Sequence, residues 1–326
     1  MSASLTIAKS PPAKRGHGAR RDLLRRFVAA YWLRPENALW MALRSEALSR
    51  AATTSRSLDL ACGDGVFSFL HFGGEFAPAW DVFAEGSIAK TAPGEKSDAF
   101  DHVTDRYHPL IQRRPPRVFD VGCDLKDALL TKARRLDFYR WLVRHDANGS
   151  LPFARAEFNT VYCNAAYWVR EIDAFLAETC RVTHPTGRVI LHVKLDSLRR
   201  YNFEFLSPRL DGRFLKLLAR GRLECWPSLA SREQWEERFD RAGLDIKEAT
   251  PFVTRTHAYL WDVGLRPIAP LLVRMANSLT DETRSSIKRD WVDLMMDVLT
   301  PFFDPGLDLL SGSDEPAEMQ YVLAPR

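Results

Sequence analysis

Apolar residues recur with a helical spacing in the first part of the chain. Between residues 20 and 51 they form two runs, one from Leu23 to Tyr31 and one from Leu39 to Leu48. Pro35 separates the runs, and proline is tolerated in the first turn of a helix but not in its interior. The pattern predicts two helices, which we expect to form a lid element over residues 20–55.

Short apolar runs alternate with helical patterns from residue 56 onward. The helical patterns cover residues 126–143, 171–180, 232–242 and 258–303. The apolar runs predict strands over residues 56–60, 117–123, 144–146, 159–163, 188–194, 245–253 and 319–323. Strands that alternate with helices favour an α/β fold, with a mostly parallel sheet and helices on both of its faces.

Residues 72–116 interrupt this alternation. Their glycines and prolines, with aromatic residues between them, predict an insertion that is mostly loop and ordered as a flap. Residues 1–19 contain little that could be buried, which predicts a flexible basic tail. We therefore expect a core over residues 56–254 and 317–326, and a helical insertion over residues 255–316 that covers the substrate.

Composition narrows the choice of class. The 326 residues are 46% hydrophobic and 27% charged, as in an ordinary globular protein. The net charge of +4 is too small to indicate a nucleic-acid partner, and no apolar run reaches the roughly 18 residues of a membrane span. The five cysteines form no CxxC pair and the histidines show no ligand spacing. We expect a reduced, cytoplasmic protein without a metal site, as a monomer or homodimer.

The most informative stretch is Leu58–Gly65, a strand end followed by a glycine turn and a helix start. Glycines let the backbone approach a ligand closely, and the following helix directs its N-terminus at the same place. Ligands of open α/β sheets bind outside the carboxyl ends of the strands. An ordinary strand-to-helix turn would show the same residues, so the turn alone leaves both interpretations open.

Asp124 ends the next predicted strand. A carboxylate in this place can accept hydrogen bonds from both hydroxyls of a ribose. Aspartate is also a common helix N-cap, and the two roles are compatible.

Two further patterns follow in the same order along the chain. One runs from Asp146 through Leu151–Phe153 to Asn164, and the other is the stretch Arg181–Arg188. Together with Leu58–Gly65 and Asp124 they resemble class I S-adenosylmethionine-dependent methyltransferases, in particular the type 11 group, over roughly residues 56–195. The resemblance implies a Rossmann-like sheet of seven strands, the last of them antiparallel.

The resemblance also implies roles for individual residues. Asp59, Ala61, Gly63 and Gly65 would line the methionine and ribose side of S-adenosylmethionine. Asp124 with Leu125 would bind the ribose, and Asp146 with Ala147 would meet the adenine. Asn164 and Tyr167 would face the sulfonium, although packing in the core explains an aromatic residue there equally well. The chain departs from the family pattern at Ala61, Asn159 and Thr186.

Acceptor recognition is expected outside the core, where aromatic residues are grouped. Such groups suit a largely apolar pocket, although most aromatic residues simply pack in a core. The aromatic candidates are Tyr31, Trp32, Trp40, Tyr107, Tyr201, Phe203, Phe205, Trp226, Tyr259 and Trp261. No histidine can be assigned as a general base from its sequence position.

Four functions remain in view. The leading hypothesis is methyl transfer to a small molecule of specialised or secondary metabolism. In the second, the fold cyclises S-adenosylmethionine to methylthioadenosine and azetidine-2-carboxylate, with Asn164, Trp168, Tyr201 and Ser228 as candidate catalytic residues near the methionine moiety. An RNA or protein methyltransferase is the third, and it is disfavoured because Asn164–Tyr167 lacks the prolines of the NPPY signature. A non-catalytic binding module is the fourth.

Overall fold

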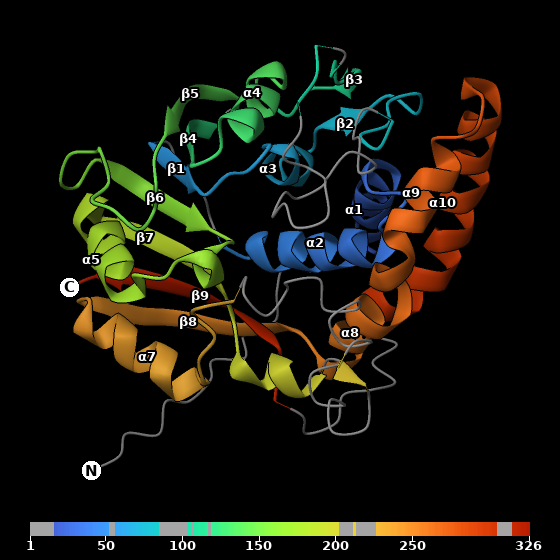
Figure 1. Ribbon diagram of the computed structural model, residues 1–326. Helices are drawn as coiled ribbons and strands as arrows, with labels where there is room; N and C mark the ends of the chain where they lie inside the picture. The colour runs from blue at the N-terminus through green and yellow to red at the C-terminus, as the bar shows by residue number, and fades with distance from the viewer. Residues whose placement is uncertain are drawn as a thin grey trace.

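The computed structural model describes residues 16–51, 56–84, 103–105, 107–116, 119–201, 211–212, 226–304 and 315–326. Predictions that concern Phe203, Phe205, Cys225, most of the tail and residues 85–102 and 106 of the insertion lie outside these residues. Within them, a central sheet is bordered on one side by helices from both ends of the chain (Figure 1).

The central sheet has seven strands in the order β5-β4-β1-β6-β7-β9-β8. Their bounds are β1 (Ser57–Leu60), β4 (Phe119–Asp124), β5 (Tyr139–Arg144), β6 (Phe158–Cys163), β7 (Thr183–Lys194), β8 (Leu244–Val253) and β9 (Glu318–Pro325). The strands from β5 to β7 pair in parallel, and β9 is antiparallel to both of its neighbours. The predicted fold class is therefore confirmed, including the antiparallel last strand.

Alternation along the strands gives the sheet two buried faces. On β6, Val161 and Cys163 belong to one apolar cluster, whereas Tyr162 between them belongs to the other. Successive side chains of a strand point to opposite faces, so each face needs its own cover. Helices α5 (Ile172–Val182) and α7 (Arg232–Arg241) contribute to the cluster of Val161. Helices α1 (His17–Ala30), α2 (Pro35–Leu48) and α3 (Val66–His71) contribute to the cluster of Tyr162.

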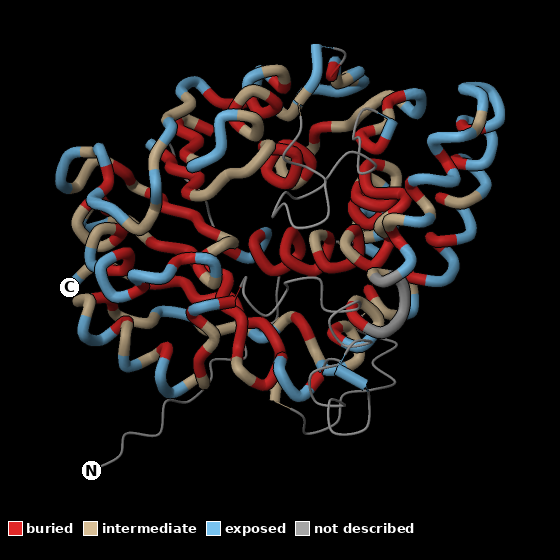
Figure 2. The backbone as a smooth tube through the Cα atoms, in the orientation of Figure 1, coloured by how far each residue is buried: buried red, intermediate tan, exposed pale blue. Residues whose placement is uncertain are grey.

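Helix α2 lies across the carboxyl ends of the central strands. Figure 1 shows the arrowheads of β6 and β7 directed toward it, and Figure 2 shows it buried along most of its length. Twelve of its 14 residues are buried, among them Glu36, Arg44 and Glu46. A helix buried on nearly all sides is unusual for one so rich in polar residues, because each buried polar group needs a partner.

The prediction of one helix over residues 126–143 was wrong. Helix α4 spans only Asp127–Arg135, and the strand β5 follows at Tyr139–Arg144 in place of the short strand predicted at residues 144–146. Asp137 has a φ of +51°, a left-handed conformation that ends the helix. Beyond it the aromatic and β-branched residues Tyr139, Trp141 and Val143 favour a strand.

Strand β7 begins earlier than predicted. It starts at Thr183, where a turn over residues 184–187 was expected, and its pairing with β6 is irregular between Phe158 and Thr160. A side chain at Gly187 would approach the Asn159 carbonyl oxygen to 2.8 Å. Close passage of the two backbones therefore accounts for a glycine that had been attributed to a turn.

The C-terminal helices pack on the N-terminal ones. They are α8 (Arg255–Tyr259), the π-helical turn η6 (Leu260–Leu265), η7 (Arg266–Ile268), α9 (Ala269–Ala276) and α10 (Asp281–Phe303). The described part of the insertion includes a small antiparallel ribbon of β2 (Glu75–Phe76) and β3 (Ile111–Arg113). Asp81 next to this ribbon accepts hydrogen bonds from Trp32 Nε1 at 2.9 Å and Arg284 Nε at 2.8 Å, which joins the insertion to α10. No helix in the described ranges combines the length and apolarity that a membrane crossing needs.

Candidate functional site

The predicted site residues follow the carboxyl edge of the sheet, strand by strand. Asp146 follows β5, Asp124 ends β4, and the turn of residues 61–65 follows β1. Asn164 follows β6 and Lys194 ends β7. Connections run outward in both directions from the boundary between β1 and β6, where a ligand crevice is expected in an open α/β sheet.

The turn after β1 is held in a left-handed conformation at alternate residues. The φ angles are +61° at Ala61, +61° at Gly63 and +75° at Gly65. Ala61 adopts the angle although it carries a Cβ, so the departure from the family glycine is accommodated at some cost in strain. A Cβ added to Gly63 would meet no atom of the described residues within 4 Å, so among these residues the space above the turn is open.

Asp124 holds this turn against the end of β4. Its Oδ2 accepts a hydrogen bond from the Gly63 amide at 2.9 Å, and its Oδ1 accepts one from the Lys126 amide at 3.0 Å. A carboxylate oxygen has more than one lone pair, so both oxygens retain acceptor capacity for a further hydroxyl. The predicted N-cap role is wrong, because Lys126 is the N-cap of α4, whereas a ribose-binding role is compatible with the position of Asp124.

Asp59 is a buried group behind the turn. Only 2% of it is exposed, and it accepts hydrogen bonds from Ser68 Oγ at 2.5 Å and the Tyr139 hydroxyl at 2.6 Å. Burial raises the pKa of Asp59 to about 6, and the two hydrogen bonds limit the shift. The placement connects β1 to α3 and β5, so Asp59 supports the turn from within, whereas the sequence predicted direct lining of the ligand.

Asp146 and Ala147 lie beyond β5, at the other end of this half of the edge. Asp146 is exposed, and its Oδ1 accepts hydrogen bonds from the backbone amide and side chain of Asn148, which lower its pKa. Leu125 is 49% exposed beside Asp124. His145, between β5 and Asp146, has a buried Nε2 atom with no hydrogen-bond partner among the described residues.

Asn164 and Tyr167 lie at the centre of the edge, after β6. Asn164 is half-buried and interacts with the buried Tyr162 hydroxyl. Tyr167, in the short helix η2 (Ala166–Trp168), turns its ring toward two cations. The Lys194 Nζ atom is 4.8 Å and the Arg44 guanidinium carbon 5.7 Å from its centroid.

The other predicted catalytic residues do not form a group with Asn164. Trp168 is 50% exposed. The Ser228 hydroxyl donates to the Val169 carbonyl, and the Tyr201 hydroxyl donates to the Glu315 carbonyl at 2.9 Å. Both hydroxyl groups therefore hold backbone segments in place, and their catalytic role stays a prediction without support from their contacts.

Sequence reasoning missed a buried cluster of charges at the end of β7, here called the cationic cluster: Arg44, Lys194 and Glu318. Glu318 Oε1 accepts from Arg44 Nε at 2.7 Å, and Glu318 Oε2 accepts from Lys194 Nζ at 3.1 Å. Trp40 Nε1 also donates to Oε2 at 2.5 Å. Pairing of Lys194 with Glu318 across β7 and β9 brings these distant residues together.

Aromatic rings surround the Lys194 ammonium group. Its Nζ is 4.1 Å from the centroid of Trp40, 4.8 Å from that of Tyr167 and 5.9 Å from that of Trp226. Ring faces attract a cation, and more strongly where water is excluded. Trp40 and Trp226 were predicted only as aromatic candidates for acceptor recognition, and no sequence signal linked them to Lys194.

The cationic cluster is almost inaccessible, and burial shifts its protonation. The side chains of Arg44, Lys194 and Glu318 are 3%, 6% and 0% exposed. Burial lowers the pKa of Lys194 to about 8, partly opposed by Glu318. Burial disfavours the carboxylate of Glu318, but Arg44 and Lys194 outweigh it and lower the pKa. The Arg44 guanidinium remains charged because Glu318, together with Tyr167 and Tyr162, raises its pKa by more than burial lowers it.

His192, two residues before Lys194, is neutral and fully engaged. Its Nδ1 lies 3.3 Å from the Tyr162 hydroxyl and its Nε2 lies 2.9 Å from Gln320 Oε1. Burial lowers its pKa to about 4. His71 and His257 are likewise bonded within the fold, to Ser45 and to Thr254 with the Phe302 carbonyl. Lys194 is therefore the titratable base nearest the centre of the edge among these residues.

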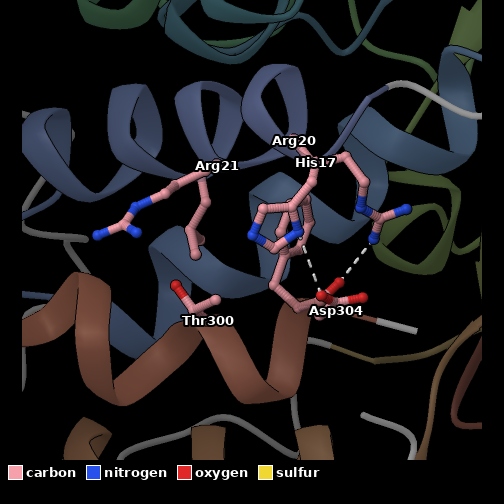
Figure 3. A pocket seen from close by; sticks show the side chains of 7 residues that line it. His17, Arg20, Arg21, Thr300 and Asp304 are labelled. Atoms are coloured by element: carbon pink, nitrogen blue, oxygen red, sulfur yellow. Dashed lines mark hydrogen bonds and ion pairs between the residues drawn. The ribbon is translucent and has the colours of Figure 1, made fainter. Parts of the chain in front are cut away.

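A small recess lies away from this edge, between the start of α1 and the end of α10. Figure 3 shows His17, Arg20 and Arg21 on α1 facing Thr300 and Asp304. Arg20 donates to the Phe303 carbonyl at 2.6 Å, and its ring-face contact with Phe303 closes the recess further. These contacts serve helix packing. Across the described part of the chain, no group of three or more metal-ligating side chains could hold an ion, and Cys62, Cys123, Cys163 and Cys180 are free thiols.

The comparison with protein families matches a segment that includes several residues of the carboxyl edge. Residues 98–191 match the family model described as a methyltransferase domain. The matched segment includes Asp124, Asp146 and Asn164 but begins after the turn of residues 61–65. The match confirms the predicted resemblance to the type 11 group of methyltransferase domains over these residues.

Solved structures resemble the chain at low identity. A methyltransferase from Geobacter sulfurreducens with S-adenosylhomocysteine is 14% identical, with 94% of this chain and 98% of that one covered and a TM-score of 0.43. One from Thiobacillus denitrificans, also with S-adenosylhomocysteine, is 14% identical, with coverage of 88% and 90% and a TM-score of 0.41. The [4+2]-cyclase SpnF is 12% identical, with coverage of 91% and 82% and a TM-score of 0.44. No curated protein matches the chain.

Proposed function

We propose that this protein is an S-adenosylmethionine-dependent methyltransferase that transfers the methyl group to a small organic molecule. The observation that carries the choice of a small acceptor is the position of α2, which lies buried across the carboxyl ends of β6 and β7. A nucleic acid or a folded protein needs an open approach to the reacting centre. A small molecule needs only a limited volume lined by aromatic and polar groups.

The residues present fit the cofactor. Open space above Gly63 suits close approach of the methionine and ribose to the backbone. Asp124 has acceptor capacity on both carboxylate oxygens for the ribose hydroxyls. The unpartnered Nε2 atom of His145 lies beside Asp146 and Ala147, where the adenine is expected.

The bound cofactor supplies a methyl group on a positively charged sulfur atom, which needs little further activation. The work of the chain is to align the acceptor with that methyl group and to exclude water. Asp124 and the turn of residues 61–65 would fix the cofactor, while Tyr167 would present an aromatic face toward the sulfur. Helix α2 would close the acceptor side against solvent, and residues 255–316 would complete the cover as a lid.

The test is mass spectrometry of the purified protein incubated with S-adenosylmethionine, first alone and then with pooled small-molecule acceptors. We expect intact cofactor in the first case, and S-adenosylhomocysteine with a methylated product in the second. Release of methylthioadenosine without an acceptor would replace the proposal with the cyclase. Methyl incorporation into RNA or protein alone would overturn the small acceptor.

A further inference from the structure

Among the residues that the structure describes, the cationic cluster has one more positive charge than negative charge. Arg44 and Lys194 are both hydrogen-bonded to Glu318, a single carboxylate. His192 contributes no charge, because both ring nitrogens are occupied and burial lowers its pKa to about 4. An uncompensated charge among groups that are over nine-tenths buried is costly, so either Lys194 loses its proton or an anion joins the cluster.

The position of the cluster favours an incoming anion. Lys194 ends β7, next to β6, and Tyr167 after β6 contacts the ammonium group with its ring. Only strand β6 therefore separates the cluster from the turn after β1 that is expected to hold the cofactor. The cluster lies on the other side of β6, where the acceptor is expected.

We propose that the cationic cluster binds a carboxylate group of the methyl acceptor. A single negative charge neutralises the excess of one positive charge, whereas a phosphate dianion would reverse its sign. Trp40, Tyr167 and Trp226 surround Lys194 with ring faces, and these suit the apolar body of an organic acid. This inference rests on the proposed function, since it specifies the chemical class of the small acceptor.

The binding depends on pH with a definite sign. Lys194 carries its charge below its pKa of about 8 and loses it above. The groups that face it are Arg44 from α2, Glu318 from β9 and Tyr167 from η2, with neutral His192 on its own strand. Of these, Arg44 and Glu318 keep their charges near neutral pH. Binding of a carboxylate is therefore strongest well below pH 8 and weakens as the pH rises through 8.

The experiment uses benzoate as the probe and tryptophan fluorescence as the readout, because three of the rings concerned are Trp40, Trp226 and the adjoining Trp261. Benzamide is the neutral probe of the same shape, and inorganic phosphate is the second anion. Titrations are made with full-length protein and S-adenosylhomocysteine, at pH 6.5, 8 and 9.5. We expect benzoate to bind at least about tenfold more tightly than benzamide, as for a charged hydrogen bond.

Variants identify the residue. Lys194→Met should reduce benzoate affinity about tenfold, to the level of benzamide, while Lys194→Arg retains most of it. Lys288→Met is the matched control, because Lys288 is also a buried lysine but donates to the Pro78 and Trp80 carbonyls under α10. If Lys194→Met does not fold, the pH dependence in the unmodified protein decides the question alone.

Equal binding of benzoate and benzamide, or benzoate affinity that is unchanged by pH, would overturn the inference. Binding of phosphate without benzoate would overturn the carboxylate assignment. Methylation of neutral acceptors in a protein that ignores benzoate would remove the inference and leave the proposed function intact. Lys194-dependent benzoate binding in a protein that methylates no small molecule would remove the proposed function instead.

Discussion

The two halves of the carboxyl edge are built in opposite ways. The half formed by β5, β4 and β1 presents backbone amides, glycines and the carboxylates of Asp124 and Asp146, with open space above Gly63. The half formed by β6, β7 and β9 presents aromatic rings and two cations, and α2 covers it. The first half can hold a large polar cofactor in contact with solvent. The second is suited to a smaller molecule that is desolvated before it reacts.

Removing Glu318, the carboxylate that Arg44 and Lys194 share, should have the largest effect on the second half. Glu318→Ala leaves Arg44 and Lys194 buried without a counter-charge, so we expect a loss of about 3–5 kcal/mol in the free energy of unfolding. Denaturant titration measures it. Glu315→Ala is the control, because its ion pair with Arg200 is partly exposed and should contribute about 1 kcal/mol or less. A similar small loss in both variants would show that the cluster is not desolvated.

The pH dependence of stability tests whether the buried Asp59 supports the first half of the edge. Its folded-state pKa of about 6 lies above the ordinary value, so its contribution to stability is full below pH 4 and is lost as the pH rises to 6. Asp59→Asn has no such loss. The variant should gain about 3 kcal/mol on the unmodified protein between pH 4 and pH 7, measured by denaturant titration at both values. The exposed Asp173→Asn is the control, and parallel pH profiles for Asp59→Asn and the unmodified protein would contradict the burial argument.

Asp124 tests whether the first half holds the cofactor. Asp124→Ala should weaken S-adenosylhomocysteine binding about tenfold to a hundredfold in calorimetry, since it removes charged hydrogen-bond acceptors. Asp124→Asn keeps an acceptor for the Gly63 amide and should give a smaller loss. Asp120→Ala is the control on the same strand, because Asp120 bonds to Ser57 and Arg140 at the other end of β4. Equal affinity in all three variants would remove Asp124 from the cofactor site.

The contrast between the halves also explains what the sequence could predict. The turn of residues 61–65, Asp124 and Asp146 lie directly after strands, so their position follows from local pattern and the rule that carboxyl ends meet at one edge. The sheet of seven strands with an antiparallel last strand was instead implied by the resemblance to the methyltransferase family. Lys194 and Glu318 gave no such signal, because a lysine and a glutamate 124 positions apart become partners only through the β7–β9 register.

The burial of helix α2 also could not be predicted from local sequence patterns. Its helical spacing was evident, yet its burial on nearly all sides depends on contacts with β8, η6 and α10 that no local pattern specifies. The helix predicted over residues 126–143 failed at Asp137, where one left-handed residue separates helix α4 from strand β5. The sequence gives local geometry well, but partners that lie far apart require the fold.

Replacing Trp168 should have the smallest effect on stability and turnover. It tests whether Trp168 acts in catalysis or is only an exposed side chain. The sequence predicted a catalytic role, but the side chain is 50% exposed and its closest ring neighbour is Tyr167, with centroids 6.0 Å apart. Trp168→Ala should change the free energy of unfolding by about 0.5 kcal/mol or less, as at other exposed positions. Turnover of a methylated product should stay within about threefold of the unmodified protein, because a change below 1 kcal/mol in the barrier has this size. A loss above about tenfold with unchanged stability would place Trp168 at the reacting centre and extend the aromatic half of the edge outward to solvent.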